Sequence, residues 1–221
     1  MNYWDSKNTG YGKDLLHHSN QNTIIATDFT NILRNKIYKS RKNFDSNIPM
    51  DVIVKLDEII KNKNKIIEFG CGTGEFVYLL QQEYNKINFV GTDFSKKSID
   101  YASKKYSNEL LKYFNFDMLK DNFNNLEYFD ISLCSNCLEH FKNPFIIINK
   151  ILSMSDYLII LVPFNQEPMT DGYDTEGGAG HVFKFVNNTF VDYNIILEFK
   201  FYTDGWLCGI NPLQWCVVIK K

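Results

Sequence analysis

The stretch that decides the fold is KIIEFGCGTGE, residues 65–75. Its first half, 65–69, is a short apolar run with β-branched residues, which predicts a buried strand. Apolar residues at helical spacing follow at once and predict a helix over 75–84. Glycines suit the junction, because a tight turn needs unusual backbone angles and the backbone must come close to a ligand. A strand, a glycine turn and a helix in this order predict the nucleotide-binding corner of a doubly wound sheet.

Strand and helix patterns alternate on either side of this corner. Expected strands lie at 65–69, 87–92, 111–116, 128–134, 157–162, 194–202 and 213–220, and expected helices at 22–42, 49–61, 75–84, 96–106 and around 145–151. Such alternation predicts a parallel sheet with helices on both faces. The segment 203–212 is too short for a crossover helix, so the last two strands should be antiparallel. We therefore predict a Rossmann-like α/β fold with a seven-stranded, mostly parallel sheet and an antiparallel C-terminal strand.

Composition excludes several classes of protein. The chain has 221 residues, of which 44% are hydrophobic and 23% charged, and its net charge is −2. These values predict one folded domain with a large core, and they argue against a general nucleic-acid binder. The longest apolar run, 157–164, is shorter than the ~20 residues of a membrane helix. With no secretory signal at the N-terminus and an odd number of cysteines, we expect a cytoplasmic protein with reduced thiols.

The glycine spacing points to a particular kind of ligand. Nicotinamide-binding corners are spaced G-x-G-x-x-G and seat a pyrophosphate on the helix N-terminus. Here the spacing is G-x-G-x-G, and Glu75 stands where the third glycine of that pattern would fall. A carboxylate there opposes a pyrophosphate, and Glu68 places a second carboxylate near the ligand. Carboxylates favour a cationic ligand, such as a sulfonium that also carries an ammonium group.

The pattern E-x-G-x-G-x-G after a first strand resembles motif I of the class I S-adenosylmethionine (SAM) dependent methyltransferases. The resemblance covers roughly 60–221 and implies SAM as cofactor and S-adenosylhomocysteine (SAH) as product. It implies that the cofactor contacts Glu68, Gly70, Cys71, Gly72, Gly74, Asp93, Phe94, Asp117, Met118, Ser135 and Asn136. It also divides the chain into an N-terminal helical lid, 1–48, and a methyltransferase domain, 49–221.

The resemblance assigns individual roles, each with an alternative. Asp93 ends the second strand, where the family's acidic residue holds the ribose hydroxyls; alternatively it caps the next helix together with Ser95. Asp117 follows the third strand, where the family contacts the adenine amine; alternatively it is an ordinary turn residue. The segment 138–140, Leu-Glu-His, looks like the family's motif IV beside the methyl group.

Two histidines are candidate catalytic bases, because imidazole titrates near neutral pH. His140 lies in the motif IV segment, although the family's Glu-His pair often has a structural role. His181 follows the glycine-rich run 177–180, which looks like an active-site flap, the alternative being a loop residue in solvent. Asp171, Asp174 and Glu176 in the same loop could join His181 around a divalent cation. Their spacing fits no known ligand pattern, so we assign no metal site.

The remaining signals concern packing and the acceptor. Cys134 and Cys137 form a C-x-x-C without the second pair that a zinc site needs, so we interpret them as packing residues. The size of the chain favours a small-molecule acceptor, with no nucleic-acid or membrane partner. By family analogy we expect methylation of an oxygen on a surface-polysaccharide (capsule) precursor or a phosphorylated metabolite. Alternatives are an N- or C-methyltransferase of another metabolite such as a quinone or amine, a nicotinamide-dependent reductase, and a non-catalytic SAM-binding protein. The sequence indicates no oligomeric state.

Overall fold

The computed structural model describes residues 23–34, 48–168, 181–203 and 213–221. Within these ranges seven strands form one sheet in the order β3-β2-β1-β4-β5-β7-β6. The strands are β1 (Lys65–Phe69), β2 (Asn88–Asp93), β3 (Leu111–Asn115), β4 (Phe129–Ser135), β5 (Ser155–Pro163), β6 (Ile195–Tyr202) and β7 (Leu213–Lys220). The helices are a helix at 23–34, α3 (Met50–Lys61), α4 (Glu75–Glu83), α5 (Lys96–Tyr106) and α6 (Pro144–Ser153), with short 3-10 turns η1 (Phe123–Asn125) and η2 (Leu138–His140).

The direction of the strands confirms the predicted sheet. β1 lies at the centre and pairs in parallel with β2 on one side and β4 on the other, so that Phe69 lies opposite Thr92 and Cys134. β7 runs antiparallel to both of its neighbours, β5 and β6. The carboxyl ends of β1, β2 and β4 therefore meet at one edge of the sheet, which is where doubly wound sheets bind their ligands.

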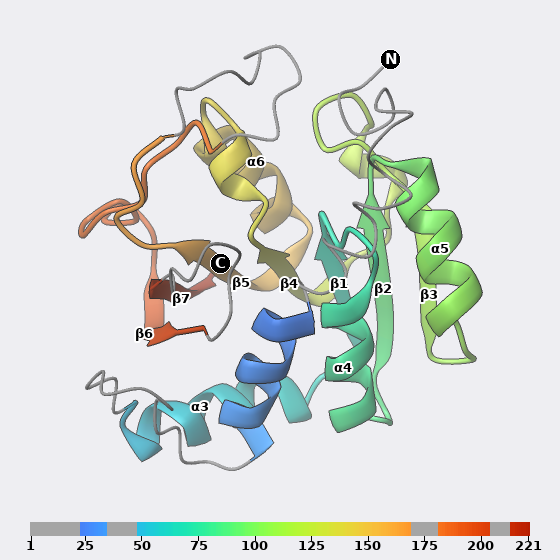
Figure 1. Ribbon diagram of the computed structural model, residues 1–221, viewed down its shortest axis with the longest axis horizontal. Coiled ribbons are helices and arrows are strands. Elements are labelled where there is room, and N and C mark those ends of the chain that lie inside the picture. Colours follow the sequence, from blue (N-terminus) through green and yellow to red (C-terminus); the bar gives the residue numbers. More distant parts are fainter. Residues whose placement is uncertain (1–22, 35–47, 169–180, 204–212) are drawn as a thin grey trace.

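Two hydrophobic layers hold the helices on opposite faces of the sheet (Figure 1). Alternate residues of a strand point to opposite faces. In β1, Ile66 packs in the layer that contains residues of α3 and α4, and Ile67 in the layer that contains residues of α6. Tyr78 of α4 stacks on Tyr106 of α5 with ring centroids 4.5 Å apart, so α5 lies beside α4.

The helix at 23–34 belongs to the core of the domain. Its Ile25, Ala26, Phe29, Ile32 and Leu33 are all buried. The Phe29 ring lies 5.4 Å from that of Phe76 in α4 and 6.5 Å from that of Phe201 in β6. This part of the predicted lid segment is thus built into the domain. The rest of it, 1–22 and 35–47, lies outside the described residues, and the boundary at residue 48 stays a prediction.

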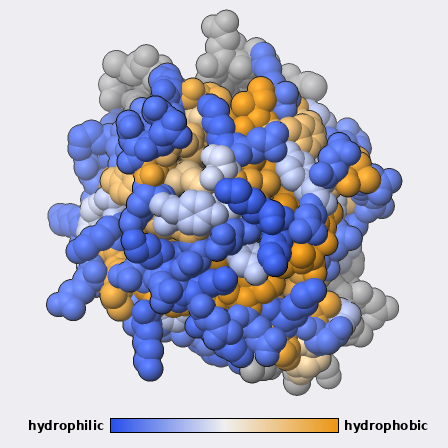
Figure 2. All heavy atoms as spheres, turned by 180° about the vertical axis from the view of Figure 1, so that it is seen from behind, coloured by the Kyte–Doolittle hydropathy of each residue, from blue (hydrophilic) through white to orange (hydrophobic). Residues whose placement is uncertain are grey.

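The outer surface is mainly polar on the face turned away from the viewer in Figure 1. Figure 2 shows that hydrophilic side chains predominate there and interrupt the hydrophobic areas. Among the described residues, the exposed large hydrophobic side chains include Leu119, Tyr128, Ile146 and Val191. No described helix is long and apolar enough to span a membrane.

Candidate active site

The glycine loop lies between β1 and α4 and has the strained backbone that its sequence predicts. Gly70, Gly72 and Gly74 have φ angles of +73°, +53° and +85°, a region that side-chain-bearing residues rarely adopt. The Cys71 amide donates to the carbonyl of Thr92 at 2.9 Å, and the Gly74 amide donates to the Cys71 carbonyl at 2.9 Å. These bonds tie the loop to the end of β2.

The carboxyl group of Glu68 lies beneath this loop. It is 1% exposed, and its Oε2 accepts a hydrogen bond from the Val77 amide of α4 at 3.2 Å. Burial raises the pKa of Glu68 from 4.5 to about 8, because a charged carboxylate is poorly solvated there. At pH 7 Glu68 is therefore mainly protonated, and it does not supply the negative charge that we expected from the sequence. Through its hydrogen bond with the Val77 amide, Glu68 instead links β1 to the first turn of α4 and so stabilises the glycine turn.

Glu75 is also turned into the protein. It is buried, and its carboxylate accepts hydrogen bonds from Thr73 Oγ1 at 2.5 Å and from the Tyr106 hydroxyl at 3.2 Å. Both acidic residues of the motif thus fasten the loop to the elements beneath it.

Asp93 connects the glycine loop to the start of α5. One of its carboxylate oxygens, Oδ2, accepts from the Gly72 amide at 3.0 Å, and the other, Oδ1, accepts from the Ser95 amide at 2.8 Å. Ser95 itself is the N-cap of α5 and accepts from the Ser98 amide. Asp93 therefore lies at the edge of the sheet where the ribose is expected. It also stabilises the start of α5 together with Ser95, which was the alternative interpretation of this residue.

Asp117 has the hydrogen bonding of a turn residue. Its Oδ1 accepts from the Leu119 amide at 2.9 Å, and its Oδ2 accepts from Lys120 Nζ at 2.8 Å. These bonds are those of the turn alternative, and an adenine contact of Asp117 stays a prediction. Met118 lies near the glycine loop, since its Cε is 3.8 Å from the place that a Cβ on Gly70 would occupy. Phe94, after β2, is half-buried.

The end of β4 lies against the glycine loop. Cys137 Sγ contacts the Phe69 carbonyl oxygen at 3.5 Å, and a Cβ on Gly70 would be 2.8 Å from Cys137 Cβ. Asn136 has a φ of +47°, and its buried Oδ1 has no hydrogen-bond partner among the described residues. Its amide nitrogen contacts Ser135 Oγ at 3.5 Å. An unpaired oxygen beside the loop can accept a hydrogen bond from a ligand.

The cysteines of the C-x-x-C are buried free thiols, which agrees with their interpretation as packing residues. The side-chain contact with Cys134, together with burial, raises the pKa of the Cys137 thiol. Such thiols are poor nucleophiles and poor metal ligands, since both roles need the thiolate.

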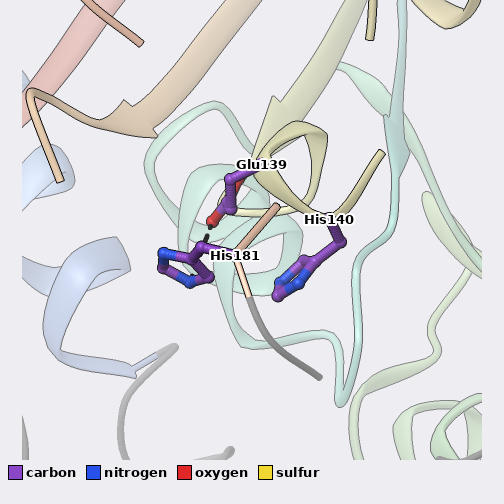
Figure 3. Close-up of side chains that lie close together, drawn as sticks. All are labelled: Glu139, His140 and His181. Atoms are coloured by element: carbon purple, nitrogen blue, oxygen red, sulfur yellow. Dashed lines mark ion pairs between the residues drawn. The ribbon is translucent and has the colours of Figure 1, made fainter. Parts of the chain in front are cut away.

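Three polar side chains meet just beyond Cys137 (Figure 3). Glu139 and His140 come from η2, and His181 comes from the segment that enters from the other side. His181 Nε2 lies 3.8 Å from Glu139 Oε1, and the rings of His140 and His181 lie 5.1 Å apart, edge to face. The His181 Nδ1 is 3.1 Å from Gln166 Oε1. The structure thus brings together both histidines that the sequence singled out.

The surroundings of Glu139 and His181 shift their pKa values in opposite directions. Burial raises the pKa of Glu139 to about 8. Burial and the adjacent His140 lower the pKa of His181 to about 4, because both disfavour its protonated form. His181 is therefore neutral at pH 7 and is a weaker base than an ordinary imidazole.

Sequence reasoning placed neither Glu139 nor Gln166 among the site residues. Glu139 was visible in the Leu-Glu-His segment but was treated only as part of the motif. Gln166 carries no local signal, because its partner His181 is set by the folding of the intervening chain. Asp171, Asp174 and Glu176 lie outside the described residues.

Residues 60–162 match the family described as "Methyltransferase domain". The matched part of the chain is therefore a methyltransferase domain. The match begins before β1 and ends in β5, so it includes the glycine loop, Asp93 and η2. Several structures with this fold were solved with SAH bound, which supports the expectation of SAM as cofactor and SAH as product.

Solved structures show the same fold at low sequence identity. The magnesium protoporphyrin IX methyltransferase of Synechocystis PCC 6803, with SAH bound, is 13% identical, with a TM-score of 0.62 over 99% of this chain and 98% of that one. Coclaurine N-methyltransferase, bound to N-methylheliamine and SAH, has a TM-score of 0.59 at 13% identity and covers 84% and 75%. The N-terminal domain of EvdMO1, in the presence of SAH and D-fucose, has a TM-score of 0.54 at 14% identity and covers 87% and 97%.

One curated protein also matches part of the chain. The DNA-directed RNA polymerase subunit beta'' of Plasmodium falciparum (isolate 3D7) is 32% identical over 91 residues. The chain spans only 9% of that protein's length, and the match covers 39% of this chain. Because the match is this short, we infer neither a family nor a function from it.

The position of Asp93 leads to a first prediction. Replacing Asp93 by alanine removes the acceptor of the Gly72 and Ser95 amides and the expected ribose contact. We expect the affinity for SAH to fall by about 10- to 100-fold, which corresponds to roughly 1.4–2.8 kcal/mol. Isothermal titration of both proteins with SAH measures the effect, and Asp130→Ala, at the opposite ends of the strands, is the control. An unchanged affinity in Asp93→Ala would show that the ribose assignment is wrong.

Proposed function

We propose that this methyltransferase transfers the methyl group of SAM to an oxygen of a small hydroxylated molecule. The observation that carries the proposal is the meeting of Glu139, His140 and His181 next to Cys137, whose side chain lies against Gly70 of the glycine loop. Polar groups that face one point can orient a hydroxyl and take up its proton. A sugar, as a precursor of a surface polysaccharide or in a phosphorylated metabolite, is the acceptor class that we favour.

The sugar acceptor is supported by one neighbour and by the chemistry of the site. The EvdMO1 domain shares the fold and was crystallised in the presence of D-fucose as well as SAH. The sequence balance, with a net charge of −2, does not favour a nucleic-acid acceptor. Methylation of a nitrogen, as the name of coclaurine N-methyltransferase indicates for that protein, is an outcome that the test below distinguishes.

The proposed reaction is an in-line displacement. The acceptor oxygen attacks the methyl carbon of SAM as the carbon–sulfur bond breaks, and the electron pair of that bond stays on sulfur. The products are the methyl ether, SAH and one proton. Most of the rate enhancement comes from holding the two reactants in line and excluding water. The cofactor-binding residues named from the sequence hold SAM in this proposal, and Glu139, His140 and His181 face the acceptor.

Binding and turnover test the proposal together. Titration with SAM, SAH and NADH should give micromolar affinities for the first two and none for NADH. Incubation of the protein with SAM labelled in its methyl group, and with sugar and amine acceptors, should label a sugar. Label on the amines alone would overturn the oxygen acceptor, and binding of NADH alone would overturn the methyltransferase function.

Single-turnover rates then examine the two histidines. His140→Ala and His181→Ala should each slow methyl transfer by about 10²- to 10⁴-fold, the usual contribution of acid–base groups. Their affinity for SAH should stay near that of the parent protein, because in this proposal both residues face the acceptor and not the cofactor. If neither variant is slower, neither histidine takes part in the chemistry.

A further inference from the structure

We propose that Glu139, His140 and His181 bind one divalent transition-metal cation, which holds the acceptor oxygen beside the cofactor. One ligand atom from each residue lies within 4.8 Å of the other two. Two imidazoles and one carboxylate are a ligand set that proteins use for zinc and for non-haem iron. The sequence did not indicate this ligand set, because His181 is far in the chain from Glu139 and His140.

The carboxylate of Glu139 is the strongest sign of a missing partner. The residue is 1% exposed, and neither of its oxygens accepts a hydrogen bond from a described residue. Leaving a buried carboxyl group without partners costs free energy, and natural proteins rarely tolerate it without a function. A cation between Glu139 and the two imidazoles would compensate both oxygens.

The orientation of His181 is also that of a metal ligand. Gln166 Oε1 can only accept, so Nδ1 carries the hydrogen in the 3.1 Å contact between them. The unprotonated Nε2 then faces Glu139 Oε1 at 3.8 Å. Ligating histidines commonly donate their second ring N–H to an oxygen in this way, which fixes the tautomer and the direction of the ring.

Backbone hydrogen bonds hold the two segments of the site together. The amides of Val182 and Phe183 both donate to the carbonyl oxygen of Glu139, at 2.8 and 3.1 Å. The residue after His181 is thus tied to the residue before His140. The side chains that would bind the cation are held near one another by the fold.

The distances fit a cation after small side-chain movements. Ligand atoms around zinc stand about 2.0–2.2 Å from the metal and hence about 3–3.5 Å from one another. The present separations, up to 4.8 Å, need shifts on the order of 1 Å. Imidazole ligands favour the transition metals over Mg²⁺ or Ca²⁺. Three protein ligands leave coordination positions open for the acceptor.

The role of the cation rests on the proposed function, whereas its binding does not. A bound cation lowers the pKa of a coordinated hydroxyl. The acceptor proton leaves to solvent, the oxygen forms its bond to the methyl carbon, and the carbon–sulfur bond breaks to give SAH. In this arrangement both histidines act as ligands rather than as the base, and the slower methyl transfer expected for their alanine variants comes from loss of the cation.

Co²⁺ absorption spectroscopy tests the binding without any turnover. After chelator treatment, the protein should take up one Co²⁺ per chain with visible ligand-field bands, and Zn²⁺ should displace it. Glu139→Gln and His181→Asn should each weaken binding by about 100-fold or more, since loss of an outer-shell partner alone costs 10- to 100-fold. Glu127→Gln, an exposed carboxylate paired with Lys65, is the matched control and should bind like the parent.

Thermal unfolding and SAH titration separate the possible failures. Zn²⁺ should raise the Tm of the parent protein and of Glu127→Gln but not that of the two ligand variants. Without metal, Glu139→Gln should be at least as stable as the parent, because it removes a buried acid that has no hydrogen-bond partner. If Glu139→Gln does not fold, the cation binding of His181→Asn tests the site instead. The metal site would be refuted if the parent protein bound no Co²⁺, or if Glu139→Gln and His181→Asn bound Co²⁺ as tightly as the parent. If SAH still binds when the metal site has been refuted, the proposed methyltransferase function is unaffected.

Discussion

Replacement of Gly74 by alanine is expected to destabilise the protein by about 2–5 kcal/mol and to abolish SAH binding at micromolar concentrations. Part of the cost, about 1–2 kcal/mol, is the φ of +85°, which an L side chain adopts only under strain. The remainder, roughly 1–3 kcal/mol, is overpacking. A Cβ at this position would lie 2.7 Å from Tyr113 Cε1 and 2.8 Å from Ala102 Cβ. Relief of either clash moves the loop on which the cofactor is expected to lie.

Urea denaturation and SAH titration of Gly74→Ala measure the two effects. Tyr113→Leu serves as a background in which part of the clash is gone. In that background the cost of Gly74→Ala should fall toward the cost of the backbone strain and of the contact with Ala102. A Gly74→Ala variant that unfolds at the same urea concentration and binds SAH like the parent would contradict the role of this glycine.

The second large effect is a pH dependence that originates at Glu68. The folded chain holds a proton on Glu68 up to a pKa of about 8, whereas the unfolded chain releases it near 4.5. Because the folded state binds more protons in this interval, stability is highest below pH 4.5 and falls as the pH rises toward 8. At about 1.36 kcal/mol per pKa unit, the loss is on the order of 4–5 kcal/mol.

Urea denaturation of the parent and of Glu68→Gln between pH 5 and pH 8 isolates this contribution. Glutamine cannot ionise, so its variant should lose less stability than the parent over the interval. The difference between the two proteins cancels the effects of all other groups. Glu127→Gln, at an exposed site, should follow the parent. Parallel curves for the parent and Glu68→Gln would show that Glu68 does not carry the effect.

Local sequence signals were sufficient for the framework of this methyltransferase. The β-branched run at 65–69, the glycines and the helix after them were predicted correctly because each element is specified by neighbouring residues. The positions of Asp93 and of the Leu-Glu-His segment followed from the same alternation. Parallel strands align their carboxyl ends, so residues that end successive strands come to one edge of the sheet whatever the details of packing.

The protonation state of Glu68, the core position of Phe29 and the meeting of His181 with Glu139 were decided only by the tertiary structure. Each depends on contacts between segments far apart in the chain. The sequence shows that Glu68 is acidic, but its burial in the folded chain, with Glu75 and Asp93 nearby, raises its pKa. It shows that His181 follows a glycine-rich run, but the hydrogen bonds from Val182 and Phe183 to Glu139 bring it to the site. Burial and long-range pairing are properties of the folded chain, because the free energy of a buried group depends on everything packed around it.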